Sequence, residues 1–318
     1  MRFRGFLVSL VEVVLVLLSV SIGTFLLVDL MGVDPAIAIL GEGYPESEYE
    51  KLREELGLND PLWWRYLSWL GASLTGDLGT QLMPPHASVS NRIANALPVS
   101  AQLAVMGLVI AIILSIPLAM ISAYKAGGRA DKAISAGAFG LLSTPSFLLG
   151  LVVIIVFANL LGWFPRSEWV RISEDLGQNL HHAILPAMVI ALAETATFTR
   201  VLRNDLITTL QEDFILSAKA KGMRPIRIMI GDALRPASLS MVTLVGISMG
   251  RLIGSTVIVE YLFALPGVGS LIIGAAGIGD VTIIQGAVLV TAIIYVFSNK
   301  LIDLSYGFLD PRIRRAHV

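Results

Sequence analysis

A long run without a charged residue, IANALPVSAQLAVMGLVIAIILSIPLAMISAY, occupies residues 93–124. A helix needs about 20 apolar residues to cross a hydrocarbon core roughly 30 Å thick, so this run is long enough to span a bilayer. Two further uncharged runs occupy residues 133–165 and 281–299. A surface helix of a soluble protein would show a polar face at helical period, and these runs have no such face. The chain is therefore predicted to be an all-α polytopic membrane protein.

The composition supports this prediction. Hydrophobic residues make up 55% of the chain, charged residues 15%, and the mean hydropathy is +0.77, which is unusual for a soluble protein. Six spans are predicted, and the first is expected to be retained rather than cleaved as a signal peptide. Their ranges are 6–28, 99–123, 134–161, 184–202, 239–263 and 281–301.

The predicted domains follow from these spans. They are an N-terminal end with the first span (1–28), an extracytoplasmic insertion (29–95), a five-helix core (96–309) that includes segment 204–236, and a tail (310–318). Segments 124–133 and 203–236 are rich in Lys and Arg and fall on the same side as Arg2, Arg4 and the tail arginines Arg312, Arg314 and Arg315. The insertion carries ten acidic and four basic residues. Short basic loops stay in the cytoplasm, so both termini are predicted to be cytoplasmic.

Several chemistries are disfavoured by what the sequence lacks. It has no Gly-x-x-x-x-Gly-Lys-Ser/Thr phosphate loop, so the chain cannot be its own ATP-driven motor. It has no cysteine, which excludes disulfides and thiolate metal sites. His181 and His182 are adjacent rather than four residues apart, so an interfacial role is favoured and no metal site is predicted. A net charge of −1 and the absence of a basic stripe with interleaved aromatics leave nucleic-acid binding unsupported.

The insertion 29–95 shows signals for a small helical cap. Asp34-Pro35 predicts a turn, Asn59-Asp60-Pro61 predicts the capped start of a helix, and residues 76–79 (GDLG) predict a loop. All five tryptophans fall in the predicted outer segments. Trp63, Trp64 and Trp69 fit either an interfacial belt or the core of a small outer subdomain.

The segment EDFILSAKAKGM, residues 212–223, is charged and rich in small residues, and it lies between apolar runs. Such a segment must lie outside the hydrocarbon. Ala218 and Gly222 are one helical turn apart, so a short helix is expected to offer a low face that another backbone can approach. Lys219 and Lys221 would flank that face. The segment is predicted to be where a soluble partner grips the membrane protein, and the simpler alternative is an amphipathic linker.

Along nearly its whole length the chain resembles the permease subunits of peptide/nickel-type ABC importers, most closely the first permease of dipeptide and oligopeptide systems. The resemblance rests on the order and spacing of short motifs: GLNDP at 57–61, GDLG at 76–79, STPSF at 143–147, EDF at 212–214, AKAKG at 218–222, VEYLF at 259–263, PGVG at 266–269 and LDPR at 309–312. The wider importer motif expects Glu where Leu216 stands, and its later proline is one residue late at Pro236.

The resemblance implies a type I importer fold in a bacterial inner (plasma) membrane. It implies as partners a second homologous permease, two cytoplasmic ABC ATPases and an extracytoplasmic substrate-binding protein. ATP and Mg would be bound by the ATPases, with no cofactor and no catalytic site on this chain. It also implies a coupling helix that contacts an ATPase, consisting of Asp213, Phe214, Ala218, Lys219, Ala220, Lys221, Gly222 and Met223.

Charges inside the predicted spans mark the candidate translocation path or gate. Glu194 and Arg251 lie near the middle of the fourth and fifth spans and should face a partner or water rather than lipid. An ion pair between them, as a clasp or gate, is one hypothesis. Glu260 is expected near the outer interface, and Arg200 and Arg203 are expected to snorkel to the cytoplasmic border.

Glycine crowds the outer segment 264–280, which contains Gly267, Gly269, Gly274, Gly277 and Gly279. Glycine permits tight, non-helical backbone, so a re-entrant or protruding loop is predicted there. Pro266, Gly267 and Gly269 are predicted to contact the binding protein. A flexible connector is the alternative.

The function that these features predict is the pore of an ATP-driven importer that couples closure of its ATPases to alternating access. Peptides are the favoured cargo, and nickel chelates, haem, glutathione and oligosaccharides are alternatives. An ATP-independent secondary transporter and a non-transport scaffold or channel subunit are the competing hypotheses.

Overall fold

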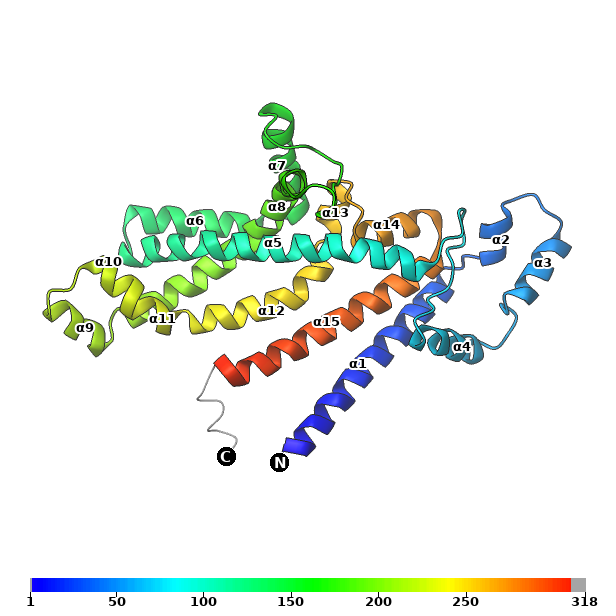
Figure 1. Ribbon diagram of the computed structural model, residues 1–318, viewed down its shortest axis with the longest axis horizontal. Coiled ribbons are helices and arrows are strands. Elements are labelled where there is room, and N and C mark those ends of the chain that lie inside the picture. Colours follow the sequence, from blue (N-terminus) through cyan, green and yellow to red (C-terminus); the bar gives the residue numbers. More distant parts are fainter. Residues whose placement is uncertain (1, 310–318) are drawn as a thin grey trace. The chain divides into compact units, whose positions relative to one another are not determined.

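The structure, a computed structural model, describes the backbone of residues 2–309 and is mostly helical over that range (Figure 1). The predicted tail 310–318 lies outside the described residues, as do the side chains of Arg2 and Arg4. The chain divides into two compact units. Unit 1 contains the residues up to Ser100 together with Pro266–Phe297, and unit 2 contains Ala101–Leu265 and the residues from Ser298 onward. These units cut across the predicted domains, whose boundaries follow membrane topology and stay a prediction.

Four described helices are long and apolar enough to cross a membrane by themselves. They are α1 (Arg2–Leu30), α5 (Val89–Tyr124), α8 (Leu176–Thr209) and α15 (Val281–Leu309). Two bent helix pairs raise the number of spans to six if each pair is counted as one crossing. The prediction of six spans therefore agrees with the structure when two of the spans are broken.

The third predicted span, 134–161, is broken in the structure. Helix α6 (Arg129–Ser143) ends inside this range. Helix α7 (Ser146–Val153) and the π-helical η1 (Ile154–Leu160) follow, and they are bent by 108° from the direction of α6. Thr144 is extended, with φ −94° and ψ 127°. Proline disfavours the helical conformation in the residue before it and has no N–H to donate, so Pro145 accounts for the break.

In unit 1, the insertion contributes α2 (Pro35–Leu40), α3 (Glu46–Glu55) and α4 (Leu62–Leu74), and α14 (Val268–Ile278) precedes α15. The core of the unit joins the first part of α5 with α14 and α15, through Leu78, Val89, Ile93, Ala96, Val268, Ala275, Ile283, Ala287 and Leu289. The buried carboxylate of Asp280 accepts the N–H groups of Leu82 at 2.9 Å and Ile283 at 3.3 Å. One side chain thus caps α15 and holds the end of the insertion.

The turn and loop signals of the insertion are confirmed, but one predicted cap is not. Asp34 accepts the N–H of Ala36 at 2.9 Å and starts α2. Asp77 accepts the N–H of Gly79 within the 76–79 loop. Helix α4 begins after Pro61 with no side-chain cap. Asn59 instead donates to Glu50 on α3 at 2.9 Å.

A network around Arg53 holds the base of the insertion. Its guanidinium contacts Asp34 at 2.7 Å, Glu46 at 2.7 Å and Glu50 at 3.1 Å. The hydrogen bonds to Glu46, Asp34 and Glu50 raise the pKa of Arg53 above its ordinary value. The arginine is therefore charged at every pH at which the protein folds, and it joins α3 to the start of α2.

The hypothesis of a small outer core is supported for Trp69, and the interfacial belt stays a prediction for Trp63 and Trp64. Trp69 packs against Phe25 of α1, with ring centroids 5.9 Å apart, and against Tyr66. Trp63 and Trp64 are exposed on α4. Trp69 therefore belongs to a small core, whereas Trp63 and Trp64 have the exposure that an interfacial belt requires.

In unit 2, α8 is the central helix, and α6, α7 and α12 (Leu239–Ser255) all pack against it. Of the most apolar window of α8, 61% is buried within the chain, against 22% for α1. Gly107 of α5 permits a close approach to α8, because a Cβ at this position would lie 2.7 Å from the Ile190 side chain. A strongly buried helix of this kind can hold a charged side chain away from lipid.

A buried carboxylate also ties the α5–α6 hairpin to α8. Asp131 accepts hydrogen bonds from Arg203 at 2.6 Å, from Ser122 at 2.5 Å and from the N–H of Gly127 at 2.7 Å. Arg203, which is expected at the cytoplasmic membrane border, therefore has its guanidinium held by Asp131. Arg200 is exposed, and its guanidinium carbon lies 5.5 Å from the centroid of the Phe139 ring.

Candidate coupling surface and intramembrane ion pair

The predicted coupling segment forms the short helix α9, Asp213–Ala220. It is followed by α10 (Pro225–Arg227), the π-helical η2 (Ile228–Ala233) and α11 (Leu234–Ala237), which leads into α12. Figure 1 shows α9 and α10 at one end of unit 2, beyond the end of α8. Helix α9 packs on η2 with Ile215 and Ala218 buried. The segment is thus a distinct helix that both contacts unit 2 and presents a free side.

The face that Ala218 was expected to offer is not the exposed one, so this detail of the prediction is corrected. Ile215 and Ala218 are three residues apart and therefore share the face of α9 that is buried. Phe214 and Leu216 carry the large apolar side chains of the exposed side. A soluble partner would meet these two side chains rather than the small residue.

Gly222 has a different role from the one predicted from its size. Its φ is +74°, and a Cβ there would meet nothing within 4 Å. Its N–H bonds the carbonyl of Lys219 at 2.9 Å, and the N–H of Met223 bonds the carbonyl of Ala218 at 3.3 Å. These two bonds form a Schellman motif, which places a left-handed residue directly after the helix. Gly222 therefore ends α9 and turns the chain toward α10.

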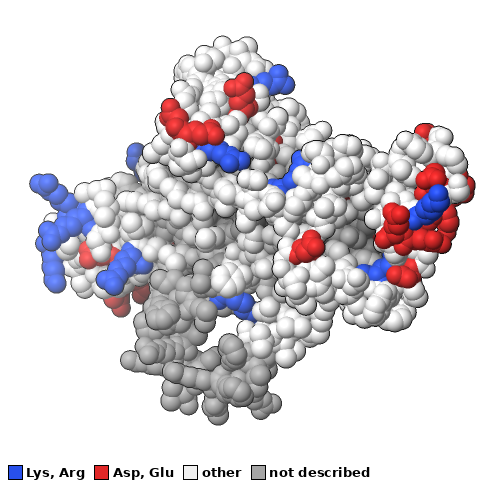
Figure 2. All heavy atoms as spheres, turned by 45° about the vertical axis from the view of Figure 1, so that its right-hand side comes forward, with Lys and Arg blue, Asp and Glu red and all other residues white. Residues whose placement is uncertain are grey.

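Basic side chains surround α9. Figure 2 shows Lys and Arg gathered over this end of unit 2. The exposed members of this group are Lys219, Lys221, Arg224 and Arg227. Beside them lies an apolar groove of about 630 Å³ lined by Pro117, Met120, Ile121, Tyr124, Arg224, Pro225, Ile226 and Met229. The exposed surface thus combines apolar and positively charged parts.

Glu194 of α8 and Arg251 of α12 form an ion pair. Arg251 Nη2 lies 2.6 Å from Glu194 Oε1, and Ser248 Oγ donates to Glu194 Oε2 at 2.7 Å. The two partners differ in exposure: the side chain of Glu194 is 7% exposed, whereas that of Arg251 is 60% exposed. The pairing hypothesis is therefore confirmed as geometry, and the pair presents its positive side outward.

The exposed side of α12 is partly polar. Exposed residues recur at helical spacing along one face, which we call the α12 stripe: Ser240, Thr243, Ile247, Arg251 and Gly254. A lipid-facing helix side is mostly apolar, and a charged side chain such as Arg251 is costly there. The α12 stripe therefore has the composition of a surface that meets protein or water.

The glycine-rich segment 264–280 is mostly helical, so the predicted non-helical loop is wrong. Helix α14 covers Val268–Ile278, and Gly279, with φ 73°, ends it in the left-handed conformation. Packing of α14 against the unit 1 core stabilises the helix, although glycine has a low intrinsic helix propensity. Of the three residues predicted to contact a binding protein, Pro266 is exposed, whereas Gly267 and Gly269 are buried. Glu260, which is expected near the outer interface, is fully buried within the chain.

The two histidines bind backbone oxygens. His181 Nε2 lies 2.9 Å from the carbonyl oxygen of Trp163, and His182 Nδ1 lies 2.7 Å from that of Gln178. Within residues that the structure describes, no group of three or more His, Cys, Asp or Glu is placed to hold a metal ion.

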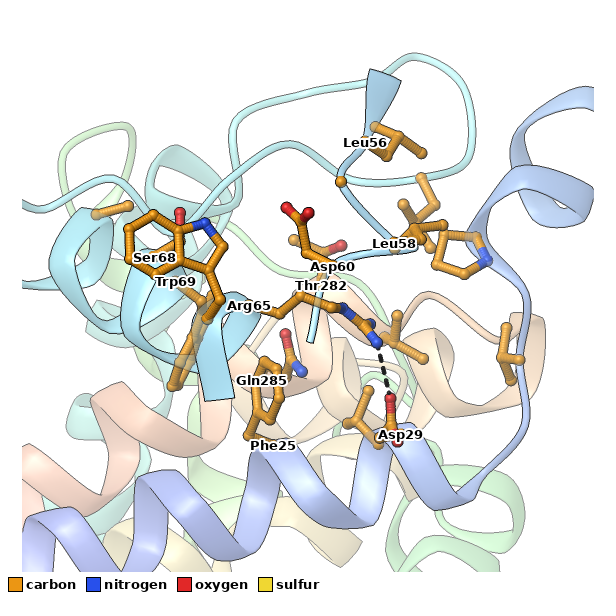
Figure 3. A pocket seen from close by; sticks show the side chains of 18 of the residues that line it. Phe25, Asp29, Leu56, Leu58, Asp60, Arg65, Ser68, Trp69, Thr282 and Gln285 are labelled. Carbon is orange, nitrogen blue, oxygen red and sulfur yellow. Dashed lines mark hydrogen bonds and ion pairs between the residues drawn. The ribbon is translucent and has the colours of Figure 1, made fainter. Parts of the chain in front are cut away.

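Sequence reasoning missed a pocket of about 490 Å³ in unit 1, between the end of α1, helix α4 and the start of α15. Figure 3 shows Arg65 reaching across it toward Asp29, and their closest atoms are 3.1 Å apart. Asp60, Trp69 and Gln285 also line the pocket. Its walls come from segments more than 200 residues apart, so no local pattern could have announced it.

Comparisons with known proteins agree with this architecture of membrane-spanning helices and a helical insertion. Residues 115–315 match the family described as binding-protein-dependent transport system inner membrane component, and residues 2–104 match the N-terminal region of such membrane components. The chain belongs to this family.

Two relatives match over nearly their whole length. The oligopeptide transport system permease protein AppB of Bacillus subtilis (strain 168) is 33% identical over 300 residues, covering 94% of this chain and 95% of the relative. A putative peptide transport system permease protein of Brucella abortus (strain 2308) is 34% identical over 299 residues, with the same coverage.

A solved structure supports the fold. A chain from inward-facing conformations of the MetNI methionine ABC transporter superposes with a TM-score of 0.53 at 17% identity, covering 71% of this chain and 96% of that chain. The chain therefore has the fold of a type I ABC importer permease and is a multi-pass pore subunit of an importer in the inner membrane.

Proposed function

We propose that this chain is the pore-forming subunit of an ATP-driven importer of di- and oligopeptides, and that α9 is its contact with an ATPase. The observation that carries the proposal is the exposed side of α9, where Phe214 and Leu216 stand outside any membrane-spanning helix among basic residues. Large exposed apolar side chains in such a place favour a protein partner. The relatives are named as permeases of oligopeptide and peptide transport systems, which favours peptides as the cargo.

The proposed orientation places α9 and α10 in the cytoplasm with both termini. It rests on the basic residues of segment 203–236, because Lys and Arg are enriched in short cytoplasmic loops. The insertion, with its acidic surplus, then lies outside and receives the substrate-binding protein. A second homologous permease and two ATPases, which bind ATP and Mg, complete the importer.

The connections of α9 suggest how ATPase closure reaches the pore. Residues 210–212 join α9 directly to α8, and α9 packs on η2, which continues through α11 to α12. Helices α8 and α12 are the two that carry Glu194 and Arg251. A displacement of α9 therefore acts on both partners of the ion pair. Coupling of this kind needs an element with two states that both ATP and cargo bias, and the α8–α12 pair is our candidate.

The proposal is tested by retention of the ATPases on the purified permease. Leu216→Glu places a charge on the exposed side of α9, and we expect the ATPases to be lost. Leu67→Glu is the matched control, because Leu67 on α4 has the same exposure, 51%, and lies in unit 1. Equal retention of the ATPases by both variants would show that α9 is not the contact.

A further inference from the structure

Arg251 is a charged residue within a membrane-spanning segment, and most of its side chain is open to the surroundings of the isolated chain. Charged side chains in spans face a bundle interior or a water-filled cavity, because lipid cannot satisfy them. Among the described residues, Glu194 is the one acceptor that Arg251 contacts. A guanidinium carries five N–H donors, so several donors remain for something outside this chain.

The pair presents donors and no acceptors to the outside. Glu194 is buried, and its two oxygens are occupied by Arg251 and Ser248. A surface made only of N–H donors fits an oxygen ligand, and the planar guanidinium fork matches a carboxylate best. We propose that Arg251 is a transient binding site for the terminal carboxylate of a peptide as it passes through the pore. This inference rests on the proposed function.

The buried glutamate makes such a site suitable for transport. Glu194 already neutralises the charge of Arg251, so an arriving carboxylate meets oriented donors without the full attraction of an isolated cation. A translocation site must bind strongly enough to admit a substrate and weakly enough to release it. The ion pair therefore orients N–H donors toward a carboxylate without binding it too tightly for release.

The residues on either side of Arg251 favour a water-lined path. Ser240 and Thr243 precede it on the α12 stripe, and Gly254 follows it. The exposed Ile247 interrupts the polar residues of the stripe, and Gly254 leaves room beside the guanidinium. A permanent contact with the second permease is the competing explanation, and it predicts that Arg251 is shielded from water.

The first experiment uses the absence of cysteine in this chain, which gives a single introduced thiol no background. Arg251→Cys and Val14→Cys are compared in the assembled importer with a water-soluble sulfonate-bearing thiosulfonate reagent. Val14 is a matched control, since it is 47% exposed on the side of α1 away from Glu12. We expect Arg251→Cys to be labelled and Val14→Cys to remain unlabelled. An unlabelled Arg251→Cys, in an importer that still assembles, would overturn the proposal.

The second experiment asks which chemical group the site recognises. ATP-dependent uptake of a dipeptide and of its C-terminal amide is compared for the unmodified importer, Arg251→Lys and Arg251→Gln, with the same binding protein throughout. The ratio of the two rates cancels any preference of the binding protein. We expect Arg251→Gln to lower the preference for the free carboxylate by about tenfold, as for loss of one charged hydrogen bond. Arg251→Lys should keep part of it.

Three outcomes are distinguishable. A loss of preference in Arg251→Gln supports the carboxylate site. An equal loss of uptake for both peptides, with the ratio unchanged, assigns Arg251 a purely structural role and overturns the site. Absence of ATP-dependent uptake by the unmodified importer would instead count against the proposed function.

Discussion

Two membrane-spanning helices expose chemically different sides, and the difference indicates what each one faces. On α1 the exposed side chains are apolar, apart from Glu12 and Ser19, with Leu10, Val11, Val14, Leu15, Leu18 and Ile22 among them. On α12 exposed apolar residues such as Val242, Ile247 and Met249 occur together with Ser240, Thr243 and the charged Arg251. Side chains that are exposed on the isolated chain can therefore face different surroundings in the membrane. The side of α1 suits lipid, whereas the α12 stripe suits protein or water.

The strongest test of this comparison places the same charge on each helix. Val14→Arg puts a guanidinium into the proposed lipid-facing side, on the face of α1 away from Glu12, at a cost of about 2.5–3.5 kcal/mol on insertion scales, so the amount of inserted protein should fall sharply. Ile247→Arg puts it on the α12 stripe, one turn from Arg251, and insertion should change little. Quantifying each variant in the membrane fraction checks this. Equal losses would mean that both sides meet lipid.

The ion pair is tested by exchanging its charges. Glu194→Leu leaves Arg251 without its acceptor, and hydrogen bonds to charged groups contribute about 1.5–3 kcal/mol, so peptide uptake should fall roughly ten- to a hundredfold. The double exchange Glu194→Arg with Arg251→Glu should restore part of the uptake of a C-terminal peptide amide, because the pair can re-form and the amide has no carboxylate for the new glutamate to repel. Uptake by the exchanged chain that is no better than that of Glu194→Leu would argue against direct pairing.

Variants at Gly222 test whether the backbone conformation at the end of α9 or the small size of the residue matters for uptake. Gly222→Val forces a β-branched residue into the left-handed conformation, which costs about 1–2 kcal/mol, so α9 should end differently and uptake should fall. Gly222→Asn tolerates that conformation and should keep most of the uptake. Both rates are measured with the amount of assembled permease as the control. Similar losses in both variants would indicate that the partner requires the small size of glycine.

The smallest effect is expected at Asp280 in unit 1. Asp280→Ala removes the cap of α15 and the acceptor for Leu82, and loss of a helix cap costs about 1 kcal/mol. Asp280→Asn keeps a side-chain oxygen, so it should lower the free energy of unfolding by only a few tenths of the loss caused by Asp280→Ala. Thermal unfolding in detergent would report both. An unchanged midpoint for Asp280→Ala would show that the contact contributes nothing.

The sequence predicted the features that depend on local composition. Uncharged runs located the spans, and the charged segment 212–223 located α9. It failed where distant packing decides the result. Ala218 is buried because η2 covers that side of α9, and the glycine-rich segment is helical because α14 packs on the core of unit 1. The contact of Asp131 with Arg203 joins residues 72 apart, so no local pattern revealed it.

One corrected feature did have a usable local signal. Gly222 follows a helix rich in Ala and Lys, which is the usual position of a helix-ending glycine. The break between α6 and α7 also has a local signal, because Pro145 disfavours helical backbone in the residue before it. Both signals concern backbone conformation, which hydropathy alone does not report.

The central claim is that this chain is a pore without a motor of its own. It is tested most directly by peptide uptake into proteoliposomes that contain the permeases and binding protein, with and without the ATPases. The account predicts uptake only when the ATPases and ATP are both present. Uptake by the permeases alone on a pH gradient would contradict it.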